Sequence, residues 1–171
     1  MTAHIDTFRL PRYREIPNVG LYLDQTVKYI NGYLTPLGCM EITASMVSNY
    51  VKKGYIANPV KKQYSAEQIA YLTAMAIIKN VVSMENIARL FERQKQVYTV
   101  EVAYDYFCTE LENMLHYTFG LKETIDEVGV TNSETKSMLR SVIIAVAHII
   151  YLNDRFDALA AAAPDTVTEQ A

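Results

Sequence analysis

Apolar residues in the first half of the chain recur at the three-and-four spacing of helices that bury one face. Residues 22–34 carry the stripe Leu23, Val27, Ile30 and Leu34, and Pro36 with Gly38 ends the predicted helix. Two further helices are predicted after Ser65 and Ser83, to about Asn80 and about Gln94. Ser65 and Gln68 have the spacing of a capping box, and Ser83 is a second candidate N-cap. The first half therefore predicts short, closely spaced helices.

The stretch from Ile42 to Ser65 contains the most informative helix of this half. Thr43 is a candidate N-cap, and the apolar positions that follow predict a helix over 43–53. Gly54 suits the left-handed residue that ends a helix. A short connector follows, with a minimal hairpin expected around Asn58-Pro59, although Pro59 disfavours a regular two-residue turn.

The second half of the chain predicts two longer helices. The first begins after Thr99 and ends at Gly120, with its apolar positions at near-heptad spacing. Residues 131–134 are a candidate capping box for the last helix, which is apolar on nearly all sides. Such a helix needs cover from the rest of the domain or from a second subunit. His148 on this helix is expected to be a core histidine.

These patterns predict an all-α protein. The predicted domain organisation is an N-terminal arm (1–21), a helical head (22–95), a C-terminal helical region for core packing or dimerisation (96–160) and a disordered tail (161–171). The arm contains Pro11, Pro17 and three arginines, and it is expected to pack on the domain or, as the alternative, to contact a partner.

The amino-acid composition favours a helical fold and disfavours a secreted or membrane protein. The chain has 171 residues, 50% of them apolar, with only 6 glycines and 5 prolines, which favours long helices and few turns. Cys39 and Cys108 form no disulfide framework, so a cytoplasmic location is expected. The N-terminus lacks the apolar core of a signal peptide. The run 142–152 is about half of the roughly 20 residues that span a bilayer, so a buried helix is expected and no membrane partner.

Charge is distributed unevenly and marks a possible nucleic-acid interface. The net charge is −3, yet four lysines and no acid lie between Glu41 and Glu67. A short helix followed by a basic connector is one way of presenting a helix to DNA. The candidate DNA-binding residues are Thr43, Ser45, Ser48, Asn49, Tyr50, Lys52, Lys53, Lys61, Lys62 and Tyr64.

The expected roles of these residues differ. The four lysines would neutralise phosphates, whereas Ser45, Ser48 and Asn49 could hydrogen-bond base edges or phosphates. Tyr50 and Tyr64 would either pack the connector onto the helix or offer a hydroxyl to a phosphate. As the alternative, a lysine pair at a helix end is a solvated terminus.

Other chemistry is weakly indicated. The three histidines are far apart and lack partners at metal-ligand spacing, and no phosphate loop or catalytic arrangement stands out. No enzyme activity, cofactor or metal is therefore expected. The seven acids from Glu101 to Glu127 are interpreted as a solvated face. Aromatic residues and methionines of the second half would line either a core or a small-molecule pocket.

The segments ITASMVSNYVKKGYI, YSAEQIAYL and VSMENIARLF together resemble the DNA-binding head of MerR-type transcriptional regulators. The matching positions are Tyr50, Gly54, Ile56, Tyr64, Ser65, Ser83, Glu85 and Ile87. The chain from Leu10 to about Phe91 is also similar to a bacterial family catalogued as a domain of unknown function, with regulator-like members. The MerR resemblance implies a winged helix-turn-helix head, followed by long C-terminal helices that form a helical bundle.

The resemblance also implies a function. It predicts a sequence-specific transcriptional regulator that places the 43–53 helix in the major groove of double-stranded DNA, with a short basic wing over 55–64. Regulators of this kind are usually homodimers, here through the C-terminal helices. A non-enzymatic protein-interaction module that has lost DNA binding is the alternative, favoured by Ser45 and Ser48, where such helices often carry arginine. Sensing of a small-molecule effector by the C-terminal helices is a further alternative.

Overall fold

The computed structural model describes residues 4–129 and 132–162, and within them the chain is all-helical, as predicted. Two isolated β-bridges are the extent of β-structure in these ranges. The α-helices are α1 (Leu23–Leu34), α2 (Ala44–Lys52), α3 (Ala66–Ile78), α4 (Met84–Val97), α5 (Val100–Thr118) and α6 (Glu134–Ala162). Two short 3-10 helices, η2 (Tyr13–Glu15) and η3 (Thr35–Leu37), lie before α1 and after it.

Side-chain caps begin the helices where the sequence predicts them. Thr43 Oγ1 accepts a hydrogen bond from the Met46 amide at 3.2 Å, and Ser83 and Thr99 cap α4 and α5 in the same way. Ser65 and Gln68 form the predicted capping box. For α6 the N-cap is Ser133, whose Oγ accepts from the Lys136 amide at 3.1 Å. Thr131, the expected first residue of that box, lies outside the described residues.

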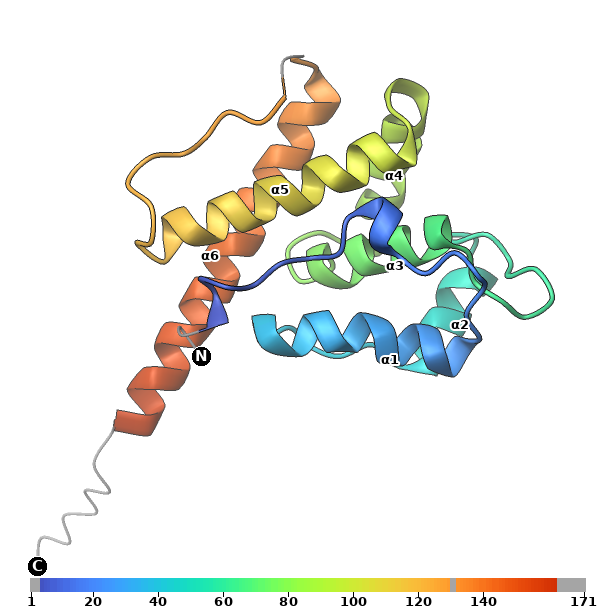
Figure 1. Ribbon diagram of the computed structural model, residues 1–171, viewed down its shortest axis with the longest axis horizontal. Helices are drawn as coiled ribbons and strands as arrows, with labels where there is room; N and C mark the ends of the chain where they lie inside the picture. The colour runs from blue at the N-terminus through green and yellow to red at the C-terminus, as the bar shows by residue number, and fades with distance from the viewer. Residues whose placement is uncertain (1–3, 130–131, 163–171) are drawn as a thin grey trace, which may run out of the picture.

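Helix α3 lies at the centre of the molecule, between α1 and α5 (Figure 1). Ten of its thirteen residues are buried, so its environment differs from that of an amphipathic surface helix with one apolar face. One hydrophobic cluster includes Leu34 of α1, Ile77 of α3, Phe107 of α5 and Val146 of α6. Buried packing is therefore continuous from α1 to α6.

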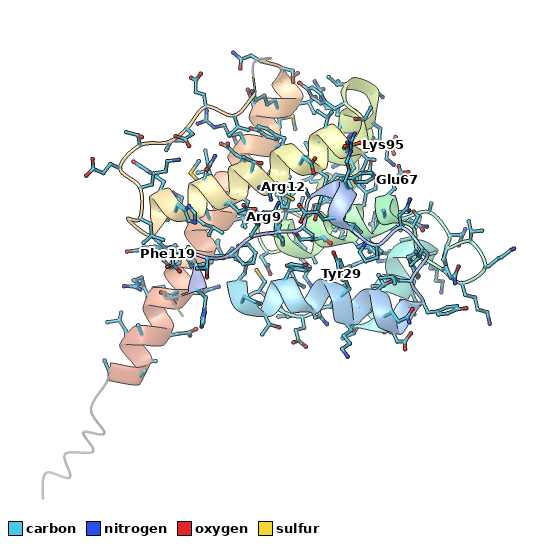
Figure 2. The ribbon with its side chains drawn as sticks, viewed as in Figure 1. Arg9, Arg12, Tyr29, Glu67, Lys95 and Phe119 are labelled. Atoms are coloured by element: carbon cyan, nitrogen blue, oxygen red, sulfur yellow. The ribbon has the colours of Figure 1, made fainter. Side chains whose placement is uncertain are left out.

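The N-terminal arm packs on the domain, and its arginines pair with acids of the same chain. Leu10 is fully buried, and the Arg12 guanidinium donates to both oxygens of Glu112 on α5, at 2.6 and 3.0 Å. Arg14 donates to Glu101 at 2.7 Å. Figure 2 shows Arg9 and Arg12 along the path of the arm over the helices. The interpretation of these acids as a purely solvated face was therefore wrong.

Helix α6 is only partly covered, contrary to the expectation of a buried helix. It packs mainly on α5, and its final turns extend away from the other helices (Figure 1). His148 is exposed, so the expectation of a core histidine was wrong. Among the described residues, α6 is the one helix long and apolar enough to cross a membrane. Core helices of soluble proteins also pass this test, and 28% of its most apolar window is buried.

Candidate nucleic-acid interface

Helix α2 exposes one polar stripe and buries the opposite face. Val47 and Tyr50 are buried, whereas Ser45, Ser48 and Asn49 are exposed together with Lys52. The four exposed residues occupy positions i, i+3, i+4 and i+7, which lie on one face of an α-helix. The structure thus brings four of the predicted site residues into a single stripe, which we call the α2 polar face (Ser45, Ser48, Asn49 and Lys52).

The ends of α2 are fixed by backbone and side-chain hydrogen bonds. Thr43 is engaged as the N-cap. At the other end the Tyr55 amide donates to the Tyr50 carbonyl at 2.9 Å, and the Gly54 amide donates to Val51 at 3.0 Å. These two bonds, with Gly54 at φ +77°, form a Schellman motif. Helix α2 is consequently short and sharply terminated, with Lys52 and Lys53 exposed at its C-terminal end.

An amide clamp that sequence reasoning missed sets the position of α2 against α1. Asn31 of α1 donates from Nδ2 to the Ile42 carbonyl and accepts at Oδ1 from the Ile42 amide, both at 2.9 Å. Ile42 directly precedes the cap of α2, so this two-way bond restrains the start of the helix. A polar residue beside the apolar stripe of α1 was the available signal, but its partner lies 11 positions away.

A two-residue hairpin follows α2, which we call the wing (Val60–Gln63). Val60 and Gln63 exchange backbone hydrogen bonds at 3.1 and 2.9 Å, and Lys61 and Lys62 are the turn residues. Both lysines are exposed and have positive φ angles, 50° and 63°. Positive φ at both central positions is the requirement of a type I′ turn. The hairpin expected around Asn58-Pro59 is therefore displaced to the lysine pair, and Pro59 precedes it.

The wing is anchored to the domain on two sides. Tyr64 pairs with Leu21 through backbone hydrogen bonds of 2.7 and 3.1 Å, which connect the wing to the end of the arm. Gln68, besides closing the capping box, donates from Nε2 to the carbonyls of Ala57 and Asn58 at 3.0 and 3.1 Å. The wing and α2 lie at one end of the molecule, and the C-terminal end of α6 lies at the other (Figure 1).

Tyr50 and Tyr64 are both buried, with exposed fractions of 7% and 3%. Both belong to the hydrophobic cluster, as their predicted packing role requires. Burial raises the pKa of each phenol, so both stay protonated at neutral pH. Contact of either hydroxyl with a phosphate stays a prediction.

The four lysines of this region have no anionic partner among the described residues. Each of Lys52, Lys53, Lys61 and Lys62 is exposed, and the ion pairs within 4–129 and 132–162 involve none of them. By contrast, Arg9, Arg12 and Arg14 of the arm are all paired. The positive charge of α2 and the wing is consequently available to an external anion.

The parts of the chain that the structure describes offer few side chains suited to binding a metal ion or to reacting as a thiolate. No group of three or more His, Cys, Asp and Glu side chains there is arranged to hold a metal ion. Burial raises the pKa of Cys39 to about 11 and that of Cys108 to about 12, which disfavours the reactive thiolate at neutral pH. Cys108 instead lies 3.7 Å from the Pro11 carbonyl, where it contributes to holding the arm.

The fold and this surface together define an all-helical protein with a short exposed helix and a basic hairpin at one end. Comparison with protein-family models gives a match over residues 11–107, more than half of the chain, to a domain of unknown function, DUF1836. The chain belongs to this family. The matched range contains α1 to α4 and ends within α5. No curated protein and no solved structure matches the chain.

Proposed function

We propose that this protein is a DNA-binding transcriptional regulator of the MerR-like winged helix-turn-helix type. In this proposal the α2 polar face enters the major groove and the wing contacts the flanking phosphate backbone. The observation that carries it is the set of four exposed lysines at the end of α2 and in the wing, which have no anionic partner among the described residues. Lysines of this kind release counterions when they meet phosphates, which supplies affinity without reading sequence.

The conformation of the wing supports the same proposal. Lysine is a poor residue for a type I′ turn, where Asn-Gly is preferred. Two lysines held at positive φ angles therefore carry a conformational cost that the fold itself does not require. A role for the charged tips in contacting an anionic partner accounts for that cost.

Base readout would come from Ser45, Ser48 and Asn49. Asn pairs well with adenine and Ser hydrogen-bonds several base edges, so these side chains suit groove contact but discriminate less than arginine. Thr43 is engaged as the cap and would contribute through the helix N-terminus, which favours a phosphate. The amide clamp of Asn31 would keep this face in position.

The salt dependence of DNA affinity tests the proposal. Four phosphate contacts predict a slope of about −3.6 in log affinity against log salt, hence roughly a 100-fold loss between about 50 and 200 mM salt. Fluorescence anisotropy with DNA from upstream of the protein's own gene measures it. Lys61→Glu with Lys62→Glu should lower the slope by about 2. Arg89→Glu with Lys122→Glu makes the same charge change elsewhere and should leave the slope nearly intact.

Affinity that is indifferent to salt, or unchanged by the two wing substitutions, would reject the proposal. The second candidate, a protein-interaction module on this scaffold, would then gain support.

We further propose that the protein acts as a homodimer through α6. Residues at heptad a and d spacing form a seam along this helix, and they are Met138, Val142, Ala145, Ile149, Leu152, Phe156 and Leu159. Phe156 and Leu159 are 62% and 66% exposed, whereas the opposite face, including Ile143 and Ile150, is buried against the domain. Val142 packs partly on the hydrophobic cluster, but most of the seam has no cover from the described residues. A second α6 packed against the seam would cover it.

Dimerisation is tested by light scattering coupled to size exclusion over a range of concentrations. Leu152→Lys with Phe156→Lys should give a monomer, because two charges would enter the seam. Ala158→Lys, on an exposed face away from the seam, should leave the dimer intact. A wild-type chain that stays monomeric at high micromolar concentration would exclude this mode of assembly.

A further inference from the structure

Two adjoining cavities lie between α5 and α6, beneath the segment 127–129. The first has a volume of about 170 Å³ and the second about 80 Å³. Tyr106, Val128, Gly129 and Lys136 border both, so the two form one cleft with two chambers. Neither chamber includes a residue of the α2 polar face or the wing.

The larger chamber is apolar. Val102, Ala103 and Tyr106 of α5 line one side, and Leu139 of α6 lines another. A dry cavity of roughly 150 Å³ lined by apolar side chains accepts a benzene ring, so this chamber has room for one aromatic or branched aliphatic group. Burial, followed by the charge of Glu110, raises the pKa of Tyr106 to about 12, so the ring stays neutral.

The smaller chamber is polar and contains a buried carboxylate that is only half satisfied. Glu110 is 1% exposed; its Oε1 accepts from Arg140 Nε at 3.1 Å, and its Oε2 has no hydrogen-bond partner among the described residues. An unpaired buried acceptor of this kind is unfavourable, and a donor supplied from outside would satisfy it. A positively charged donor would suit it best.

A cation lies at the boundary between the chambers. Lys136 Nζ is 5.5 Å from the centre of the Tyr106 ring, and the ion pairs of the described residues do not include it. The cleft therefore presents an apolar chamber, a cation at its border and an unsatisfied anionic oxygen beyond. All three features belong to residues that line these two adjoining chambers.

We propose that this cleft binds a free α-amino acid with an apolar side chain. The side chain occupies the apolar chamber, the α-ammonium donates to Glu110 Oε2, and the α-carboxylate pairs with Lys136. A simple carboxylic acid would leave Glu110 unsatisfied, and a simple amine would leave Lys136 without a partner. Binding at this cleft does not depend on the proposed contact with DNA.

Calorimetry with the full chain tests the proposal. The probes are L-phenylalanine, L-leucine, 3-phenylpropanoate, which lacks the ammonium, and 2-phenylethylamine, which lacks the carboxylate. We expect at least one of the amino acids to bind, and each phenylalanine analogue to bind about 10- to 100-fold more weakly, since each loses one charge-assisted hydrogen bond. Binding should also raise the melting temperature measured by circular dichroism.

Variants locate the site. Ala103→Leu fills the apolar chamber and should abolish binding while the helical spectrum is retained, and Lys136→Gln should weaken binding by about tenfold or more. Glu110→Gln should do the same, and Lys28→Gln on α1 is the matched surface control. Absence of heat with both amino acids at millimolar concentration overturns the proposal. Equal affinity for the analogues, or binding unaffected by Ala103→Leu, also overturns it.

Discussion

Replacing Lys61 with asparagine and Lys62 with glycine would separate the conformational role of the wing from its charge. Both lysines have positive φ angles in a two-residue turn for which Asn-Gly is the preferred sequence. A residue with a Cβ in this region costs about 1–2 kcal/mol, and glycine recovers that cost but loses roughly 0.5–1 kcal/mol of chain entropy. Asparagine, which tolerates this region better than lysine, relieves part of the same cost at position 61. We expect the two changes together to make the variant about 1–2 kcal/mol more stable.

The expected gain is measurable by thermal denaturation. For a chain of this length, 1 kcal/mol corresponds to a shift of roughly 2–4 °C, so the melting temperature should rise by about 2–8 °C. DNA affinity should move in the opposite direction, since two of the proposed phosphate contacts disappear and the salt slope falls by about 2. Greater stability with weaker binding is the signature of a turn held in an unfavourable conformation for the sake of its side chains.

The matched control is Lys61→Gln with Lys62→Gln, which removes both charges and keeps both strained positions. This variant should lose DNA affinity as the Asn-Gly variant does, with a melting temperature close to that of the wild type. If the Asn-Gly variant is no more stable than the Gln-Gln variant, the strain argument fails. If both variants retain the wild-type salt slope, the wing does not contact phosphates.

Three other perturbations test the supports of the fold. Asn31→Ala removes both hydrogen bonds of the amide clamp and should destabilise the chain by about 1–3 kcal/mol in urea unfolding. It should also weaken DNA binding by more than this loss of stability explains. Glu112→Gln leaves the half-buried guanidinium of Arg12 poorly paired, so trypsin should cleave the arm faster while the helical spectrum is retained. Cys39 and Cys108, whose pKa values burial raises to about 11 and about 12, should react with a thiol reagent at pH 8 only after unfolding. The unfolded chain ionises these thiols near pH 9, whereas the folded chain keeps them protonated. The free energy of unfolding should therefore fall as the pH rises from 9 toward 12. A urea midpoint that is flat over this range would contradict their burial.

Local signals in the sequence predict much of the helical framework. Thr43, Ser65, Ser83 and Thr99 mark helix starts because a hydroxyl that caps the first turn acts within three residues. Gly54 marks a helix end for an equally local reason. Helix starts of this kind can be recognised without knowledge of the rest of the chain.

Features that depend on distant residues could not be predicted in this way. Arg12 and Glu112 lie 100 positions apart, so an arm pairing with α5 has no local signature. The turn at Lys61 and Lys62 opposes local preference, which pointed instead to Asn58-Pro59. His148 is exposed because α6 buries only one of its apolar faces, and periodicity alone does not say which face meets the domain.

For the candidate site, the sequence shows where the positive charge lies but not whether a carboxylate elsewhere in the fold neutralises it. Counting residues identifies four lysines in an acid-free window, yet a carboxylate from elsewhere in the fold could have neutralised them. The arginines of the arm illustrate that outcome, since acids of α5 pair with two of them. Distinguishing the two cases required the three-dimensional arrangement.

The attachment of the arm to α5 also has a consequence for the order in which the protein folds during synthesis. The arm emerges from the ribosome before the helices, and its partners Glu101 and Glu112 emerge some 90 to 100 residues later. Contacts of such high sequence separation form slowly, because the entropy of closing a long loop must be overcome before they contribute. Helices α1 to α4 would therefore collapse around α3 while the arm is still undocked. Docking of the arm onto α5 would then be a late step, in which residues synthesised before the helices reach their native positions after them.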